Sequence, residues 1–599
     1  MKLSDFVFQY IAAHGVKHVF MFPGGGAMHL VDSLGRCKDI EYICNLHEQA
    51  CAIAAEAYAR VNNKLGVALV TTGPGGTNAI TGVAGAWLDS TPCLFISGQV
   101  KRTDLMGDLG VRQLGVQEID IVSLVRPITK YAVTIMEPSS IRYHLEKALY
   151  FAKAGRPGPV WLDIPLDVQA ASIEPEMLDG FDLKEMDIQF DRYILEKQVS
   201  DVVDLINMSE RPVILAGNGI RLAGAEKEFL DLANHLNIPL LTTWLGIDLL
   251  PESHKLFMGR PGSIAPRGAN FTLQNSDCLL IIGSRLDMAL TGYAHDKFAR
   301  AAKKIMVDID ANEIRKVNAS IDIQLCADAG VFIHELFKSI DKINAKPSSN
   351  WLARCQGWKE KYPVVLTEHR MHRGSVSTYF FSEILADELS NDDLIVPGSS
   401  GNCVEIFLLA FKVKSGQRVF HNRGLGAMGF GLPASIGACI ASGRRRTICV
   451  DGDGGFQLNI QELETVARLK LPIKFFVINN KGYASIRAMQ MNYFQQLVGA
   501  DSGSGLTLPD IIKLAMAYGL STMRIVDQHD LRTQIRDVLK LPGPVICEIM
   551  AVPDEIRAPR LSSAQRSDGT MISKPLEDLW PFLDRQEFLS NMLIQPLDE

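Results

Sequence analysis

The side chains best suited to chemistry are Asp453, in the glycine-rich segment 450–456, and Asn480, in the pair Asn479-Asn480. An apolar run precedes each of them, and the amphipathic stretch between them predicts a strand–helix–strand unit. Such a unit places both side chains at the carboxyl ends of two parallel strands, where open α/β sheets bind ligands. The glycines let the backbone approach a phosphate, and one carboxylate, one amide oxygen and diphosphate oxygens suit Mg²⁺. The alternative is an ordinary strand–turn–helix without a ligand.

A third candidate is Glu48, which follows a predicted strand (40–44) and begins a predicted helix (47–60). The alternative is a purely structural role, because a glutamate at the start of a helix interacts favourably with the helix dipole. The glycine–aspartate–glycine segment and the Asn-Asn pair, however, resemble the cofactor motif of thiamine diphosphate (ThDP) enzymes. ThDP needs a carboxylic acid that hydrogen-bonds its pyrimidine ring, and this resemblance assigns that role to Glu48. The bond-making chemistry belongs to the cofactor.

Size and composition indicate a globular protein of several domains. The 599 residues predict three or more domains, and 47% hydrophobic and 22% charged residues are ordinary proportions. The net charge of −7 and the lack of a Lys/Arg run argue against nucleic-acid binding. The 11 cysteines have no metal-type spacing, which favours reduced thiols in a cytoplasmic protein. No apolar stretch approaches the length of a membrane span, so we expect no membrane association.

Predicted strands and helices alternate along most of the chain, which indicates an α/β fold of doubly wound parallel sheets. We expect three such domains, and the first and third look like one architecture used twice. Residues 171–191 are expected to form a surface linker. The expected units are a first domain at 1–170, a central domain at 192–345, a third domain at 365–552 and a tail at 553–599.

Motifs along nearly the whole chain resemble those of the ThDP-dependent decarboxylase superfamily. Within it, they resemble the large catalytic subunit of acetohydroxyacid (acetolactate) synthase. The resemblance implies a pyrimidine-binding first domain, a central domain and a diphosphate-binding third domain. The motifs in chain order are PGGG, HEQ, GPGGTNAITG, ISGQV, VQEID, RPGPVWLDIP, GLGAMGFGLPASIGA and GDGGF…NIQEL…NN.

The resemblance also assigns roles to individual residues. Catalytic roles fall to Glu48 as the pyrimidine-activating acid, to the Gly25 backbone near the reacting oxygen, and to Gln117 in the same pocket. Mg²⁺ is held by Asp453, Asn480 and the carbonyl of Gly482. The cofactor contacts are Asn402, Gly426, Gly452, Gly454, Gly455 and the apolar wedge Met428, for which a core methionine is the alternative.

The resemblance further implies that the central domain binds FAD as a structural cofactor. A glycine at one strand end and an acidic residue at another are what a dinucleotide crevice requires. A domain that has lost its nucleotide is the alternative. The residues at matching places are Gly217, Gly219, Arg285, Asp308 and Asp328.

Active sites in this family lie between the pyrimidine domain of one subunit and the diphosphate domain of another. The resemblance therefore implies a homodimer or homotetramer, and it leaves open a small regulatory subunit. In the tail, Leu576, Trp580 and Phe582 predict a segment that packs on the dimer near the active-site mouth, because disordered chain is depleted in such residues.

Three positions depart from the synthase pattern around the acceptor pocket. Ala289 stands where the family has an arginine for the acceptor carboxylate, Met489 where it has a tryptophan, and Val116 where it has a phenylalanine. Loss of a guanidinium–carboxylate pair weakens selection of a second 2-oxo acid. The departures predict slow acetolactate formation from pyruvate alone, and capture of the two-carbon unit by an added uncharged ketone.

The expected function is ThDP- and Mg²⁺-dependent decarboxylation of pyruvate, with transfer of the hydroxyethyl or acetyl unit to a second carbonyl substrate. Acetolactate is the product when that substrate is another pyruvate. One alternative is acetyl transfer to a bulky ketone without a carboxylate, such as a keto sugar. The other is an inert regulatory paralogue, against which the intact Glu48, Asp453 and Asn480 argue.

Overall fold

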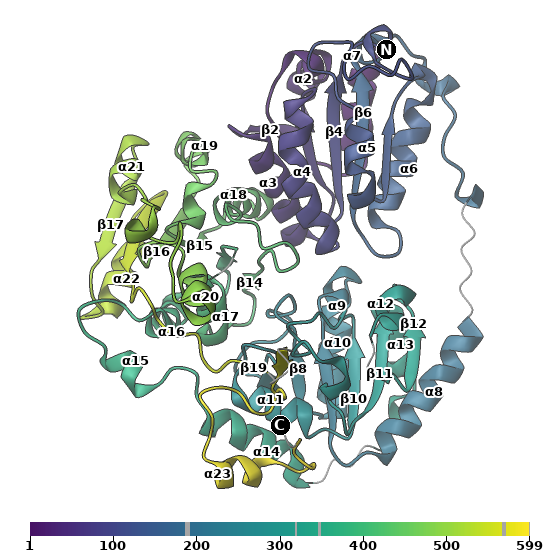
Figure 1. The fold of residues 1–599 in the computed structure, drawn as a ribbon. Coiled ribbons are helices and arrows are strands. Elements are labelled where there is room, and N and C mark those ends of the chain that lie inside the picture. The colour runs from purple at the N-terminus through teal and green to yellow at the C-terminus, as the bar shows by residue number, and fades with distance from the viewer. Residues whose placement is uncertain (186–191, 318–319, 345–348, 400, 566–570, 598–599) are drawn as a thin grey trace.

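The computed structural model describes residues 1–185, 192–317, 320–344, 349–399, 401–565 and 571–597. It contains three six-stranded parallel sheets in successive parts of the chain, with helices packed on them (Figure 1). This arrangement confirms the predicted fold class of three doubly wound α/β domains. Of the predicted linker, residues 186–191 lie outside the described part. No helix among the described residues is long and apolar enough to cross a membrane.

The first sheet has the strand order β2-β1-β3-β4-β6-β5. Its side chains alternate between two apolar clusters: Ala68 and Val70 of β3 belong to one, and Val67 and Leu69 to the other. Both faces are therefore covered, as a parallel sheet requires. The strands are β1 (His18–Met21), β2 (Glu41–Cys44), β3 (Gly66–Val70), β4 (Cys93–Gln99), β5 (Tyr131–Thr134) and β6 (Pro159–Pro165). The helices are α1 (Leu3–Ala13), α2 (Met28–Arg36), α3 (Glu48–Asn62), α4 (Pro74–Leu88), α5 (Ile121–Val125), α6 (Ile141–Lys153) and α7 (Leu166–Ala170).

The third sheet repeats this topology, because its order β14-β13-β15-β16-β18-β17 corresponds strand by strand to that of the first. Gly452 at the end of β15 lies opposite Ile478 of β16, so these two strands end at the same edge. The strands are β13 (Leu394–Pro397), β14 (Arg418–Val419), β15 (Thr447–Gly452), β16 (Ile473–Asn479), β17 (Ser521–Ile525) and β18 (Val545–Met550). The helices are α16 (Thr378–Glu388), α17 (Glu405–Ala410), α18 (Gly431–Ala441), α19 (Glu462–Leu469), α20 (Ala484–Phe494), α21 (Ile511–Ala517) and α22 (Leu531–Lys540).

The central sheet has a different order, β12-β11-β10-β7-β8-β9. Numbered along this domain and read from the β9 edge, the order is 3-2-1-4-5-6, which is that of dinucleotide-binding sheets. It reverses between β7 and β10, where such sheets form a ligand crevice. The strands are β7 (Pro212–Ala216), β8 (Leu240–Thr242), β9 (Phe257–Gly259), β10 (Cys278–Ile282), β11 (Lys303–Asp308) and β12 (Ile323–Cys326). The helices are α8 (Arg192–Met208), α9 (Gly219–Leu222), α10 (Glu226–Leu236), α11 (Arg267–Gln274), α12 (Ala311–Arg315), α13 (Ala329–Lys338) and α14 (Ser349–Lys361).

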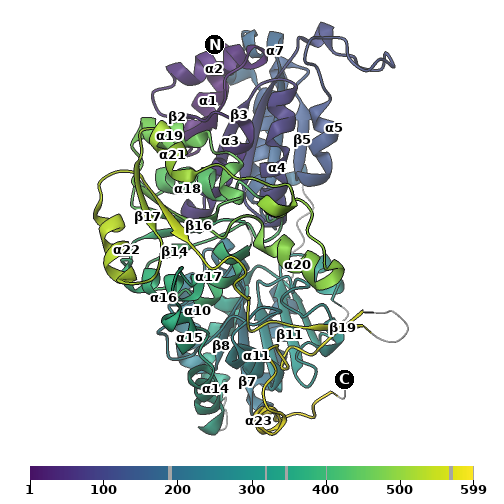
Figure 2. The ribbon, with the colours of Figure 1, turned by 60° about the vertical axis from the view of Figure 1, so that its left-hand side comes forward.

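The C-terminal tail lies on the central domain, where its yellow trace crosses the teal elements in Figure 2. Arg267 and Asn270 of α11 donate to the carbonyls of Leu579 and Leu576 at 2.8 and 2.7 Å. Leu576 and Phe588 belong to an apolar cluster with residues of the central sheet. The tail thus covers one face of that sheet, and its place near an active-site mouth stays a prediction. Its elements are β19 (Ser563–Gln565), β20 (Met571–Ser573) and α23 (Arg585–Asn591).

The first and third domains meet through α3 and α18, which lie side by side (Figure 1). A Cβ at Gly437 of α18 would lie 2.0 Å from the carbonyl oxygen of Ala54 in α3, so only glycine permits this approach. One apolar cluster spans the contact and includes Ala55 of α3 together with Ile436 and Cys439 of α18. The two domains therefore share a continuous core.

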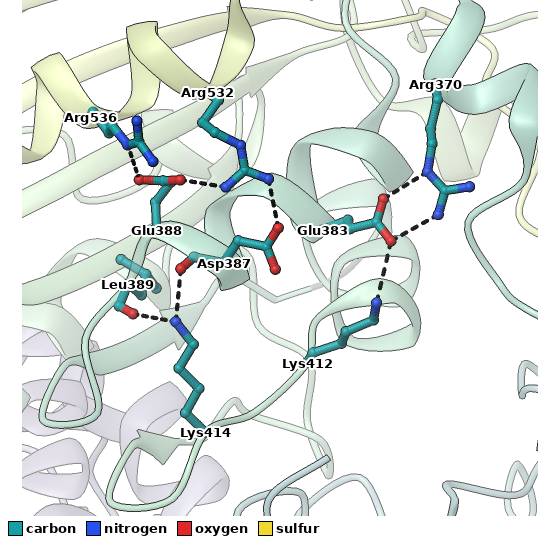
Figure 3. Close-up of polar contacts among 9 residues, drawn as sticks. All are labelled: Arg370, Glu383, Asp387, Glu388, Leu389, Lys412, Lys414, Arg532 and Arg536. Atoms are coloured by element: carbon teal, nitrogen blue, oxygen red, sulfur yellow. Dashed lines mark hydrogen bonds and ion pairs between the residues drawn. The ribbon is translucent and has the colours of Figure 1, made fainter. Parts of the chain in front are cut away.

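Ion pairs tie together the outer helices of the third domain (Figure 3). Arg532 of α22 lies 2.7 Å from Asp387 and 2.5 Å from Glu388, both in α16. Arg370 of α15 (Thr367–Met371) forks onto Glu383 of α16 at 2.9 and 3.0 Å. Most of these side chains are partly exposed, so each pair contributes only about 0.2–1 kcal/mol. The cluster orders the helices and takes no part in the site described next.

Candidate active site

The carboxyl edge of the third sheet gathers the predicted metal and diphosphate residues. Strands β13, β15 and β16 are parallel neighbours. Asn402 follows the first of them, Asp453 the second and Asn480 the third. The strand order reverses between β13 and β15, so this edge is the switch point at which such sheets bind ligands.

Asp453 is held by backbone donors. Its Oδ1 accepts the N–H of Gly454 at 2.9 Å, and its Oδ2 accepts the N–H of Gly482 at 3.0 Å. Burial raises the pKa of Asp453 to about 6, against the lowering effect of these two N–H groups. A carboxylate fixed in this way keeps further lone pairs available for a hard cation.

Asn402 and Asn480 carry buried polar atoms without a partner among the described residues. These atoms are Nδ2 of Asn402, a donor, and Oδ1 of Asn480, an acceptor, in side chains of residues only 3% and 6% exposed. Each unpaired buried atom costs about 1–3 kcal/mol. An anionic oxygen would satisfy the donor, and a cation would satisfy the acceptor. The pair therefore fits a diphosphate together with its metal ion.

Glycine is required in the segments around these residues for two different reasons, close packing and backbone conformation. A Cβ at Gly454 would lie 2.2 Å from the ring of Tyr483, so this glycine is required by packing. Gly426 has a φ of 65°, and Asn422 Oδ1 accepts its N–H at 3.0 Å. Met428, two residues further on, is half-buried. The predicted cofactor glycines that the structure places at the end of β15 are Gly452, Gly454 and Gly455.

Glu48 is the first residue of α3, directly after the loop that follows β2. It is 6% exposed, and its Oε2 accepts the Nδ2 donor of Asn78 in α4 at 3.0 Å. The amide fixes the orientation of this carboxyl group. Sequence reasoning missed Asn78, although it stands within the motif GPGGTNAITG. The contact links two helices that are separated in the sequence, and no local pattern predicts it.

Gly25 and Gln117 both lie near the carboxyl edge of the first sheet. Gly25 begins a short 3-10 turn after β1, and a Cβ there would meet nothing within 4 Å. Gln117 is exposed, with a φ of 65°, and its carbonyl oxygen packs against Gly73 after β3. The space beside Gly25 is thus open, whereas the main chain of Gln117 packs closely on Gly73.

A cavity of about 500 Å³ opens at the switch point of the central sheet. It also reaches the first and third domains, because Asp89 and Arg423 contribute to its wall. Gly217 lies beside it and packs on β10: a Cβ there would lie 2.1 Å from the Gly283 carbonyl oxygen. The predicted flavin residues that line the cavity are Gly219, Arg285, Asp308 and Asp328.

Two of these predicted flavin residues are acidic and differ in their bonding. Burial raises the pKa of Asp308, and its Oδ1 accepts the N–H of Asp310 at 2.9 Å. Asp328 caps α13 by accepting the N–H groups of Gly330 and Val331 at 2.9 and 3.1 Å. Asp308 is therefore the more available acceptor for a ligand hydroxyl.

The three departures from the synthase pattern lie on separate parts of the described chain. Ala289 lines the central cavity. Met489 of α20 is 55% exposed, and Val116, in the loop before α5, is 86% exposed. The α20 helix and this loop each present apolar side chains to solvent in the single chain. The other exposed apolar residues of these two stretches are Leu109, Val111, Leu114, Ile486, Met491, Tyr493 and Phe494.

Family models of the thiamine pyrophosphate enzyme match three segments. The N-terminal TPP binding domain matches residues 1–124, the central domain 199–336 and the C-terminal TPP binding domain 399–549. The acetolactate synthase large subunit of Cyanidium caldarium is 32% identical over 94% of this chain and 95% of its own. The probable acetolactate synthase large subunit of Methanocaldococcus jannaschii is 33% identical over 93% of each chain. Acetolactate synthase 2, chloroplastic, of Nicotiana tabacum is 31% identical over 94% of this chain and 84% of its own.

Proposed function

Because this chain belongs to the thiamine pyrophosphate enzyme family, within its group of acetolactate synthase large subunits, we propose that it makes acetolactate. In this reaction two pyruvate anions and one proton give one acetolactate anion and one CO₂. The observation that carries the proposal is the third-sheet edge. There Asp453 stands between an unpaired buried donor and an unpaired buried acceptor, as a metal-bound diphosphate requires.

The third domain would hold the cofactor, which would supply the nucleophilic carbon that adds to the 2-oxo acid and the ring that accepts the electron pair when CO₂ leaves. Asp453, Asn480 and the Gly482 carbonyl are the proposed Mg²⁺ ligands, and their oxygens suit this cation. Asn402 would donate through Nδ2 to a diphosphate oxygen. Met428 would contact the cofactor through its apolar side chain, and the neighbouring glycines would let the backbone approach it.

The first domain would supply the groups that move or hold protons. Glu48 would hold a proton on its carboxyl group and hydrogen-bond the pyrimidine ring. Asn78 keeps that carboxyl oriented through the 3.0 Å bond to Oε2. The open N–H of Gly25 would donate to the reacting oxygen of the substrate, and Gln117 would line the same pocket.

The central domain is proposed to bind FAD. Its strand order is that of dinucleotide-binding sheets, and the cavity lies at the point where the order reverses. Gly219 lines the cavity and packs on the main chain of Gly283, and Asp308 offers a buried carboxylate at the end of β11. The flavin would be structural, since the joining of two pyruvates with loss of CO₂ involves no net oxidation. A yellow protein that releases flavin on denaturation is the expected result.

We also propose a homo-oligomer in which the first domain of one subunit meets the third domain of another. The apolar loop around Val116 and the apolar face of α20 are exposed in the single chain, and contiguous exposed apolar surface marks interaction sites. Both surfaces lie beside proposed site residues, Gln117 in one case and Gly482 in the other. Light scattering at several protein concentrations tests this.

The names of the relatives do not favour a keto-sugar acceptor or an inert paralogue. The deciding experiment incubates the purified protein with pyruvate, ThDP and Mg²⁺, with and without an added uncharged ketone, and quantifies products by NMR. We expect one CO₂ for each acetolactate, and no reaction when ThDP is omitted. An unreactive protein contradicts enzymatic function altogether. Transfer to the ketone with little acetolactate favours the keto-sugar alternative instead.

A further inference from the structure

A buried ion triad joins two helices of the first domain. The guanidinium of Arg60, in α3, lies 2.5 Å from Glu56 of the same helix and 2.6 Å from Asp89, which directly follows α4. The two carboxylates are fully buried, and the Arg60 side chain is 7% exposed. Burial alone would lower the pKa of Arg60, and the two carboxylates more than reverse this effect. The guanidinium therefore stays charged inside the protein.

This triad holds a segment of the third domain by its backbone. Asp89 accepts the N–H of Gly424 on Oδ1 at 2.9 Å and the N–H of Arg423 on Oδ2 at 3.1 Å. Arg60 Nη1 donates to the carbonyl of His421 at 3.0 Å. Three main-chain groups within four residues are thus fixed by two side chains of another domain.

The segment that is held in this way leads directly to residues proposed to touch ThDP. Asn422 Oδ1 accepts the N–H groups of Leu425 and Gly426, each at 3.0 Å. Met428 follows two residues later. From residue 421 to residue 426 the main chain is therefore fixed by the first domain and by one internal amide, and this fixes where the cofactor-facing turn begins.

Stability alone does not account for this arrangement. Desolvation cancels most of the Coulomb gain of a buried ion pair, and apolar side chains of similar volume often stabilise as well. What charged groups add is direction, because each short hydrogen bond permits few orientations.

We propose that Arg60 and Asp89 are positioning residues for the cofactor. They act through segment 421–426, which places Gly426 and Met428 against ThDP, and they do not touch the cofactor themselves. This inference rests on the proposed function, because it requires ThDP at that turn.

A second buried carboxylate provides a matched control. Asp248 of the central domain is as buried as Asp89 and lies 2.6 Å from Arg418 and 3.1 Å from Arg221. It accepts the N–H of Val419 in β14 at 2.9 Å. Asp248 thus makes the same kinds of bond to the third domain, but at Arg418 and Val419, before segment 421–426. Its partner Arg418 contacts Arg60 only at the main-chain carbonyl, so the Arg60 side chain keeps its bonds.

The test compares Asp89→Asn with Asp248→Asn. Each variant weakens a buried ion pair and a bond to a backbone N–H, so we expect both to lower the thermal midpoint. Calorimetric titration of the apoprotein with ThDP at fixed Mg²⁺ should show the Kd rise about tenfold or more for Asp89→Asn. For Asp248→Asn it should stay within about twofold of the parent. At saturating ThDP, Asp89→Asn should lower kcat and leave the KM for pyruvate unchanged.

The ThDP Kd values of the two variants distinguish a positioning role from a structural one. A Kd for ThDP that is unchanged in Asp89→Asn, or that rises equally in both variants, overturns the positioning role. If Asp89→Asn does not fold, Arg60→Lys replaces it. Lysine keeps the charge but cannot bridge two carboxylates and the His421 carbonyl together, so the same rise is expected. A parent protein that binds no ThDP contradicts the proposed function instead, which separates the two failures.

Discussion

The first and third domains share one strand order but present different chemistry at the same edge. In each, the order reverses between the first and third strands of the domain, β1 and β3 in one, β13 and β15 in the other. At the third-domain edge, a carboxylate and two amides gather with buried unpaired atoms. At the first-domain edge lie open backbone at Gly25 and, on the outer side, the acid Glu48. We propose that one architecture thus provides two complementary halves of a site.

This difference indicates that the fold determines where a ligand lies, while the side chains after each strand determine what is done there. The third-domain edge is built to hold charge, because its groups suit a cation and an anion. We propose that the first-domain edge holds and donates protons, through Glu48 and the backbone of Gly25. Substitutions at the two edges should therefore have different effects. Those at the first-domain edge should lower turnover, and those at the third-domain edge should lower the affinity for the cofactor.

The largest effect is expected from Glu48→Gln. An amide cannot hold the proton that the pyrimidine requires, so we expect turnover of pyruvate to fall about 100-fold or more. The ThDP Kd should change little, because the third domain carries most of the binding groups. Steady-state kinetics and calorimetric titration measure the two quantities. Glu41→Gln, on the exposed end of β2, is the control and should retain activity. Turnover at the parent rate in Glu48→Gln would contradict the proposal that Glu48 holds a proton for the reaction.

A smaller loss, of a different kind, is expected from Asp453→Ala. The variant lacks the anionic oxygen proposed for Mg²⁺, so the Kd for ThDP at limiting Mg²⁺ should rise about 10- to 100-fold. High concentrations of ThDP and Mg²⁺ should restore part of the activity, which they should not do for Glu48→Gln. Asp537→Ala, at an exposed position within α22, serves as the control. An unchanged Kd in Asp453→Ala would contradict the metal role.

Two glycines sharpen the comparison further. A Cβ at Gly454 meets the ring of Tyr483, so Gly454→Ala should destabilise the protein by about 1–3 kcal/mol. A Cβ at Gly25 meets nothing within 4 Å, so Gly25→Ala should leave the thermal midpoint unchanged and reduce turnover only. Differential scanning calorimetry and kinetics separate the two variants. A large loss of stability in Gly25→Ala would mean that the first-domain edge is filled by protein in the assembly and not by a ligand.

Much of the third-domain edge could be predicted from the sequence, because its signals are local. Asp453 and Asn480 belong to one strand–helix–strand unit, and the apolar runs on either side of the helix place them on the same edge. The fold class followed from the alternation of strands and helices in the same way. These signals need no knowledge of how distant parts of the chain pack.

The remaining features depend on packing between distant elements and left no local signal. Asn78 contacts Glu48 only because α4 lies beside α3. The bonds from Asp89 to Arg423 and Gly424 join domains across more than half of the chain. The 3-2-1-4-5-6 order of the central sheet arises from crossovers that the strand sequences do not encode individually. The glycines and acidic residues of that domain could be identified from the sequence, but the cavity that they line could not.

The smallest effect concerns a buried carboxylate of the first domain and its dependence on pH. Asp163 of β6 accepts hydrogen bonds from Ser97 Oγ at 2.5 Å and from Gln99 Nε2 and Thr134 Oγ1 at 3.1 Å. Burial nevertheless raises the pKa of Asp163 to about 7, from an ordinary value of 3.8. Because the pKa of Asp163 is higher in the folded state, its contribution to stability is complete below pH 3.8 and is lost as the pH rises to about 7.

Between pH 5.5 and 8 the free energy of unfolding of the parent should fall by about 1–2 kcal/mol through this group. The Asp163→Asn variant, which cannot ionise at this position, should not show this loss. Thermal midpoints of both proteins at the two pH values measure the difference, with Asp537→Asn at an exposed position of α22 as control. Equal pH dependence in Asp163→Asn and the parent would show that Asp163 is ionised at low cost. The first domain would then hold a buried charge, as the third-domain edge does, and the contrast between the two domains would narrow.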